Sequence, residues 1–422
     1  MHTEKSLVYH KPYLILIASQ MFSGFGDWLQ LLAVLSLSGF KFQASPLEMS
    51  VLMMCFAVPA IGIGPLAGVL ADRYNRKTMM ILSEAGRSCI VFLILFVESL
   101  WHIYVLTFLL SAFSALFVPA KNGKLKEIVS DSNMQQAVSI SGMIDNGSKM
   151  IGPALGGVLI AFFGINFSFY LNAALFLLSS LLLTALPKER YFERESAGLK
   201  SSVQMFADFK QGIVLIQKNG LLLTGLTAAC FVMLAVQIAD SQIVVLIREL
   251  PKSPVELIGT CMTASGTGML LMTALLGKIK IRLFLRFFIG GTILLGISIG
   301  SLPFMTGLTE IWVFILFSLV FFFAGAGFSF VYIPFHILAQ KTVPVTFSGR
   351  VFGSIQSMTT FASVAGMSCG GLLSELAGVK NTFILSGCLL LVTGAVIGMI
   401  NKERGRLIVT ENHTGTERQT ES

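Results

Sequence analysis

Two carboxylates interrupt long apolar runs of this sequence, and they are the side chains best suited to bind a proton or a cation. Asp27 lies in FSGFGDWLQ and Asp240 in VQIADSQ, at positions that correspond at a shift of 213 residues. An ionisable side chain inside a bilayer costs roughly 2.5 to 3.5 kcal/mol, so it usually faces a partner or a cavity. Each acid would therefore bind a proton or attract a cation, with Gln30, Gln237 and Gln242 as polar neighbours, or be a hydrogen-bonded structural acid near a helix end.

Two further charged pairs have spacings that put both members on one face of a helix. Asp145 and Lys149 are four residues apart, so they either neutralise each other or take part in proton coupling. Glu84 and Arg87 are three residues apart, and we interpret them as a structural pair that could link to the charged loop preceding them.

That loop is a dense run of charge, GVLADRYNRKTMM, between two apolar stretches. It contains Gly68, Asp72, Arg73, Arg76 and Lys77. An acid near a helix N-terminus and cations near a helix C-terminus are each favoured by the helix dipole. On residue types alone, the cations could simply hold the loop on one side of a membrane.

A second motif, GPALGG, combines a proline with three glycines inside an apolar run. Pro153 frees a backbone carbonyl and bends a helix, while Gly152, Gly156 and Gly157 allow two helices to cross closely. The segment is predicted to be a hinge or a tight seal between helices, or an ordinary crossing of small residues.

The elements that must hold these residues are membrane-spanning helices. The chain of 422 residues is 54% hydrophobic and 12% charged, whereas about 25% of the residues of a soluble domain are charged. Apolar stretches of about 18 residues or more recur, and each can cross a hydrocarbon core about 30 Å thick as a helix. The sequence therefore predicts an all-α integral membrane protein. Its twelve predicted spans are 13–39, 47–70, 78–97, 103–120, 137–163, 166–186, 220–247, 255–276, 284–302, 310–333, 350–374 and 381–400.

An even number of spans puts both termini on one side of the membrane, and the charge distribution indicates which side. Most of the 30 lysines and arginines lie in the termini and in connections on the side of the N-terminus. Those on the opposite side are Lys41, Arg248, Lys252 and Lys380. The positive-inside rule therefore predicts cytoplasmic termini and a multi-pass location in the plasma (inner) membrane.

The spans divide into two halves of six that resemble each other. Residues 1–186 form the first half, 187–219 a cytoplasmic linker with an amphipathic helix, 220–400 the second half, and 401–422 a polar tail predicted to be disordered. The glycines of GPALGGVLIAFFG recur in GMSCGGLLSELAG at a constant shift of 214 residues. Because corresponding spans keep the same orientation, the repeat is parallel, about an axis along the membrane normal.

The charged loop resembles the loop signature of the major facilitator superfamily, whose fold has the same parallel repeat. In that family the loop's glycine lets helices approach closely, and its aspartate and arginines form a latch against the other half that favours the outward-open state. The resemblance implies this gating role for the five loop residues named above. Asn75 departs from the family's usual glycine, but asparagine tolerates a left-handed backbone.

GPALGG resembles a motif of exporters in this superfamily, and the chain is similar to the macrolide-efflux-like branch of its drug–proton antiporters. In the family the first helix of each half lines a central cavity. The resemblance therefore implies that Asp27 and Asp240 face that cavity near its outer half. Many of the proton-coupled exporters carry an arginine in the fourth span, whereas residues 103–120 contain none.

The resemblance implies a secondary active exporter of small lipophilic molecules, such as drugs or macrolides, working by proton antiport and alternating access. Its partners would be a small-molecule substrate, protons and the lipid bilayer, without nucleic acid, and the chain would act as a monomer. Two alternatives stay open. One is export of a specific metabolite, siderophore or lysophospholipid, and the other is a receptor or scaffold that does not transport.

Enzyme chemistry, cofactors and metals are not expected. GMSCG fits the G-x-S-x-G pattern of hydrolases, but it lies in a predicted helix, without the strand and the histidine that the motif needs. The five histidines lack metal-ligand spacing. The six cysteines all fall inside predicted spans without a CxxC pair.

Overall fold

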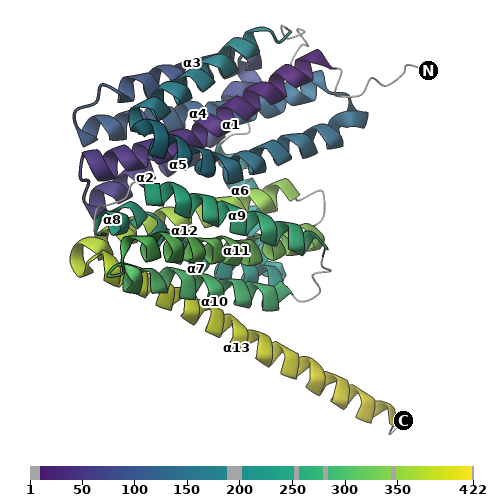
Figure 1. Ribbon diagram of the computed structural model, residues 1–422. Coiled ribbons are helices and arrows are strands. Elements are labelled where there is room, and N and C mark those ends of the chain that lie inside the picture. Colours follow the sequence, from purple (N-terminus) through teal and green to yellow (C-terminus); the bar gives the residue numbers. More distant parts are fainter. Residues whose placement is uncertain (1–9, 188–201, 251–255, 279–283, 344–347, 421–422) are drawn as a thin grey trace.

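The computed structural model describes residues 10–187, 202–250, 256–278, 284–343 and 348–420, and every regular element within these ranges is helical. The amino-terminal half contains α1 (Lys11–Ser36), the π-helical turn η2 (Leu37–Lys41), α2 (Pro46–Arg73), α3 (Arg76–Ile94), α4 (Leu100–Ile128) and α5 (Asp131–Thr184). After α6 (Ser202–Lys218), the carboxy-terminal half contains α7 (Gly220–Asp240), α8 (Ile243–Arg248), α9 (Glu256–Lys278), α10 (Phe284–Ser301), η3 (Leu302–Met305), α11 (Glu310–Thr342), α12 (Ser348–Ala377) and α13 (Val379–Thr420). Figure 1 shows the two halves as neighbouring helical bundles.

The helical membrane architecture is confirmed. Among the described residues, eight helical segments are long and apolar enough to cross a membrane, in α2, α4, the second part of α5, α7–α8, α9, α10, α11 and α13. Helices α1, α3, α12 and the first part of α5 also occupy predicted spans but are not among those eight. Three of these less apolar segments carry Asp27, Arg87 and Asp145. These three side chains form ion pairs, as described below.

Two helices run past their predicted ends. Helix α4 continues beyond residue 120 to Ile128, because Pro119 lies inside the helix without ending it. Helix α13 continues to Thr420, whereas the sequence predicts a disordered tail from residue 401. Lysine, glutamate and arginine are good helix formers, and Figure 1 shows the end of α13 projecting away from the bundle. Helix α6 occupies the predicted amphipathic linker and packs against α12 and α7.

The internal repeat is visible in the backbone at a pair of glycines. Gly164 interrupts α5 with a φ of 81°, and Gly378 separates α12 from α13 with a φ of 86°. No other residue lies within 4 Å of a Cβ added at either position. The backbone conformation, rather than crowding, therefore requires glycine where each half turns back between its last two spans.

Replacing Gly164 or Gly378 with alanine is expected to lower the free energy of unfolding by about 1–3 kcal/mol, the cost of holding an L-residue at such a positive φ. Thermal unfolding of the purified protein in detergent measures this loss. Gly62→Ala on α2 is the matched control, because its added methyl group also meets open space but in a right-handed helix. Losses no larger than that of the control would contradict the positive φ angles.

One end of the molecule, called the closed end below, is held by contacts between the halves. At this end Arg248 of α8 donates to the carbonyl oxygens of Gly39 (3.2 Å) and Ala44 (2.8 Å). Gln242 Nε2 donates to Ser50 Oγ of α2 at 2.8 Å. Figure 1 shows α8 at the end of the bundles opposite to the two chain termini. The halves are therefore bound to each other at the end away from the termini.

Candidate functional site

The amino-terminal half holds a buried charge network around Arg87 of α3. The Arg87 side chain is 1% exposed and forms an ion pair with Asp27 of α1. It also donates to Glu84 Oε1 at 2.8 Å and to Ser23 Oγ at 2.9 Å. Its Cζ lies 3.9 Å from the centre of the Phe176 ring, so the cation also rests on an aromatic face. One guanidinium thus joins α1, α3 and α5 inside this half.

The two acids of this network differ in access. The Asp27 side chain is 44% exposed, whereas the Glu84 side chain is 0% exposed. The predicted pair of Glu84 and Arg87 is therefore present, with Asp27 as an additional partner. Gln30, predicted beside Asp27, is buried, and its Oε1 has no partner among the described residues.

A second polar cluster surrounds Asp145 of α5. Asp145 Oδ1 accepts from Gln20 Nε2 of α1 at 2.6 Å, and its Oδ2 lies 3.5 Å from Lys121 Nζ of α4. Ser141 Oγ donates to Gln20 Oε1 at 2.9 Å and accepts from Lys121 Nζ at 3.4 Å. Because the Lys121 side chain is 7% exposed, Asp145 is the counterion that allows a cation to be buried there.

The predicted partner of Asp145 was Lys149, one turn along the same helix. The Lys149 side chain lies outside the described part of the structure, so that pairing stays a prediction. The contacts described for Asp145 go to α1 and α4 instead.

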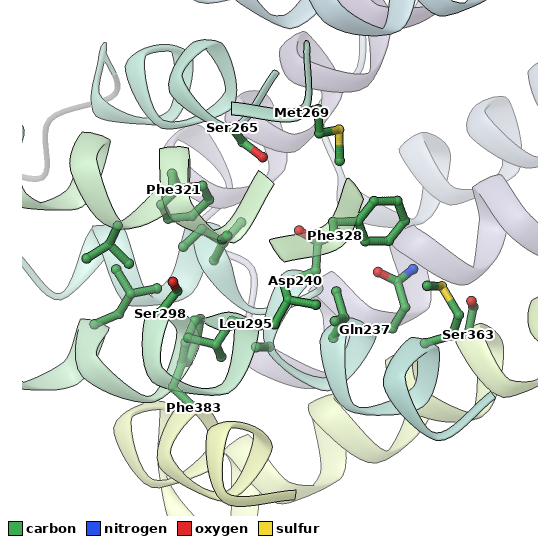
Figure 2. A pocket seen from close by; sticks show the side chains of 18 residues that line it. Gln237, Asp240, Ser265, Met269, Leu295, Ser298, Phe321, Phe328, Ser363 and Phe383 are labelled. Atoms are coloured by element: carbon green, nitrogen blue, oxygen red, sulfur yellow. The ribbon is translucent and has the colours of Figure 1, made fainter. Parts of the chain in front are cut away.

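Asp240 lies in a cavity of about 340 Å³ lined only by residues of the carboxy-terminal half. Figure 2 shows its carboxylate near the middle of this cavity, close to Gln237 and to aromatic side chains. The labelled aromatic and hydroxyl-bearing lining residues are Phe321, Phe328, Phe383, Ser265, Ser298 and Ser363. Among the described residues, no hydrogen bond or ion pair to the Asp240 side chain is present. The cavity is therefore largely apolar, with one carboxylate that has no cationic partner in the described structure.

The expectation that Asp240 faces a central cavity between the halves stays a prediction, since the cavity it lines is formed by residues of its own half. Helix α7 ends at Asp240, and the following turn directs Gln242 toward Ser50 of the other half. Asp240 shares its cavity with residues of α9, α10, α11, α12 and α13. Gln237 lines the same cavity, as predicted, but Gln242 does not.

Two cations of the charged loop, Arg76 and Lys77, are bound within the amino-terminal half. Arg76 pairs with Glu127 of α4 at 2.7 Å, and Lys77 Nζ donates to the carbonyl oxygen of Thr184 at 2.6 Å. Lys77 thereby satisfies a free carbonyl at the end of α5, where the helix dipole favours a cation. In this conformation both side chains fasten the loop to its own half.

Other members of the loop motif stay as predictions. Arg73 is the exposed last residue of α2. The packing around Gly68 and the side chain of Asp72 lie outside the described structure. The left-handed backbone considered for Asn75 is wrong. Asn75 has a φ of −63° and caps α3 by accepting from the backbone N–H of Thr78 at 3.0 Å.

The GPALGG motif lies where α5 crosses two helices. Gly152 and Gly156 pack against side chains of α1, and Gly157 meets the backbone of Gly259 on α9, in the other half. The side chain of Pro153 lies outside the described structure. The motif therefore contains a close crossing between the halves as well as one within its own half.

The second copy of the motif makes equivalent contacts. Gly366 and Gly370 pack against the backbone of α7, the first helix of their half, and Gly371 packs against Ser50 of α2 across the halves. In both halves, the first two of these glycines pack against the first helix of their own half, and the third packs against the second helix of the other half. The contacts therefore agree with the sequence alignment of the two motifs.

Sequence reasoning missed Lys121 as an interior residue. The predicted fourth span ended at residue 120, so this lysine was assigned to a loop, whereas α4 carries it into the interior. A helix continued past Pro119 would have placed Lys121 inside that helix instead of in a loop. The sequence held no comparable signal for Gln20 or Ser23, because their partners lie on other helices.

Comparisons with known proteins agree with this architecture. Residues 16–367 match the family described as Major Facilitator Superfamily. The chain is 48% identical over 409 residues to the uncharacterized MFS-type transporter YfiS of Bacillus subtilis (strain 168), covering 96% of this chain and 98% of that protein. It is 22% identical to macrolide efflux protein A of Streptococcus pyogenes, covering 85% and 89%. The crystal structure of the nucleoside transporter NupG aligns with a TM-score of 0.71 at 16% identity, covering 93% and 99%.

Proposed function

The chain belongs to the major facilitator superfamily, and from this membership we propose that it exports small lipophilic molecules in exchange for protons. It is a multi-pass membrane transporter rather than an enzyme. The observation that carries the finer proposal is the cavity around Asp240, where one carboxylate stands among phenylalanine, leucine and methionine side chains. A lipophilic cation would bury its apolar body there and neutralise the acid, whereas a strongly polar solute would leave its polar groups without partners.

The two halves support a division of tasks. In the amino-terminal half, Asp27 already has a cation beside it, so a proton can displace an existing ion pair. In the carboxy-terminal half, Asp240 has space beside it but no cation in the described structure. We assign proton coupling mainly to the first site and substrate binding mainly to the second. The similarity to macrolide efflux protein A supports the direction of transport.

The proposal includes an orientation. The plasma membrane is its location, both termini are cytoplasmic, and the chain acts as a monomer. The closed end then faces the exterior, and the halves would rock about the midplane to open it. Arg248 and Gln242 would have to release their partners in the other half at that step.

Everted membrane vesicles with an acidic lumen test this function. With ethidium as the probe, the wild-type chain is expected to accumulate the dye, and the accumulation should collapse when an uncoupler removes the proton gradient. In the Asp240→Asn variant we expect affinity for ethidium to fall about ten- to a hundredfold, because a charged contact contributes about 1.5–3 kcal/mol. Glu98→Gln, which changes an exposed acid outside the cavity, is the control.

The probe panel separates the alternatives. Gradient-driven accumulation of a lysophospholipid but not of ethidium or erythromycin would favour a specific exporter. Wild-type vesicles that accumulate none of the three, although the protein is folded and correctly inserted, would contradict the proposed export.

A further inference from the structure

Two carboxylates share one guanidinium in the amino-terminal half, and their charges do not balance. Arg87 contacts both Asp27 and Glu84. If both acids were ionised, the network would carry one uncompensated negative charge in the interior. The charged groups that face Glu84 are Arg87 on its own helix and Asp27 on α1, while α5 presents the hydroxyl group of Ser179. Among the described residues, Lys121 of the neighbouring cluster is already paired with Asp145.

The hydrogen bonds of Glu84 indicate which of its oxygens is free. Oε1 accepts from Arg87 Nη1 at 2.8 Å and from Ser23 Oγ at 3.0 Å. Oε2 is buried and makes no geometrically well-formed hydrogen bond among the described residues, and the nearby Ser179 hydroxyl donates to the carbonyl oxygen of Ser19 at 3.2 Å. A buried carboxylate oxygen without a partner costs several kcal/mol. A carboxylic acid with its C=O at Oε1 and its O–H at Oε2 removes the cost of the buried charge, and the oxygen of Ser179 is the nearby group that can accept from that O–H.

We propose that Glu84 is a proton-holding group of this transporter and that its protonation alternates with that of Asp27, because the two acids compete for their common partner Arg87. When Asp27 is ionised and paired with Arg87, Glu84 carries the proton. When Asp27 is protonated, Arg87 is left to Glu84, which is then ionised. In the exchange one O–H bond breaks at Glu84 and one forms at Asp27, so the charge of the network does not change.

The geometry gives each acid a separate part. Asp27, with a half-exposed side chain, is the member that can exchange protons with water. Glu84 is sealed from water and can gain or lose a proton only through the network. Ser23 bridges Glu84 and Arg87, because its hydroxyl donates to Glu84 and accepts from Arg87. This inference extends the proton coupling of the proposed function by naming a second group that holds the proton.

Infrared spectroscopy of the purified protein at neutral pH tests the proposal without any substrate. Protein labelled with ¹³C at the glutamate side-chain carboxyl is expected to show a shifted C=O stretching band of a protonated carboxylic acid. The band should be absent in Glu84→Gln and unchanged in Glu98→Gln. In Asp27→Asn it should also disappear, because Arg87 then has Glu84 as its only acidic partner in the network and Glu84 ionises.

Three results would overturn the proposal. They are a wild-type spectrum without this band, a band that responds to ¹³C-aspartate instead of ¹³C-glutamate, and a glutamate band that persists in Asp27→Asn. The labelled wild-type protein gives the first two answers even if a variant fails to fold.

A transport measurement keeps this inference separate from the proposed function. In everted vesicles, Glu84→Gln is expected to lower gradient-driven ethidium accumulation at least tenfold while leaving ethidium binding to the purified protein within twofold of wild type. Wild-type vesicles without accumulation would reject the export function, and the infrared result would still decide the protonation of Glu84. Normal gradient-driven accumulation by Glu84→Gln would reject only the role of Glu84 in coupling. The proposed export function would stand.

Discussion

Arg87→Leu is expected to lower the free energy of unfolding by about 3 kcal/mol and to abolish gradient-driven transport. Removing one member of a buried ion pair typically costs about 3–5 kcal/mol, because the other charge is left uncompensated. We expect the lower end of that range, since the Asp27 side chain is 44% exposed and part of its charge stays hydrated. Thermal unfolding in detergent measures the stability, and vesicle uptake of ethidium measures the transport.

A second substitution separates charge from packing in that result. Adding Asp27→Asn to Arg87→Leu removes the unpaired carboxylate and should recover about half of the lost stability, but not the transport. Arg286→Leu, at an exposed arginine of α10, is the matched control and should change stability by less than about 0.5 kcal/mol. If Arg87→Leu were as stable as this control, the ion pairs of Arg87 would not stabilise the amino-terminal half.

Much of the fold could be predicted from the sequence because the membrane simplifies the problem. Apolar length locates the spans, and glycines recurring at one shift identify the repeat. Gly164 and Gly378 were matched by sequence position alone, and their backbone angles agree to within a few degrees. Such features depend on local composition and on spacing along one chain segment, which a sequence displays directly.

The candidate site could be predicted only in part, because its contacts join different helices. The spacing of Glu84 and Arg87 indicated an ion pair, since both residues lie on one helix. Nothing in the sequence showed that Asp27 completes this network from α1, or that Asp240 turns into its own half. Helix rotation and the place where α7 ends decide these contacts, and both depend on tertiary packing.

The resulting asymmetry between the halves bears on coupling. The repeat supplies equivalent acids at Asp27 and Asp240, but a cation accompanies only the first of them within the described residues. On the proposed function, the first acid exchanges protons against a fixed guanidinium, and the second accepts a cation from outside the protein. Equivalent positions of the repeat would thus differ in task because their neighbours differ.

Gly157→Leu is expected to force the closed end open. The α5 and α9 backbones touch at Gly157 and Gly259, so a side chain has no rotamer that avoids the neighbouring helix. Overpacking of this kind costs about 1–3 kcal/mol, and the cost falls only on the conformation in which the halves touch. The population with the closed end open should therefore rise about ten- to a hundredfold.

A single cysteine at Ser50 reports this opening from a second crossing. Ser50 is 1% exposed and lies against Gly371 of the other half, away from the substituted glycine. In a background without other cysteines, Ser50→Cys should react slowly with a membrane-impermeant maleimide, and Gly157→Leu should raise the rate at least tenfold. Gly62→Leu, whose side chain meets open space, should not raise it. An unchanged rate in Gly157→Leu would mean that the two crossings open independently, which the rocking of rigid halves does not allow.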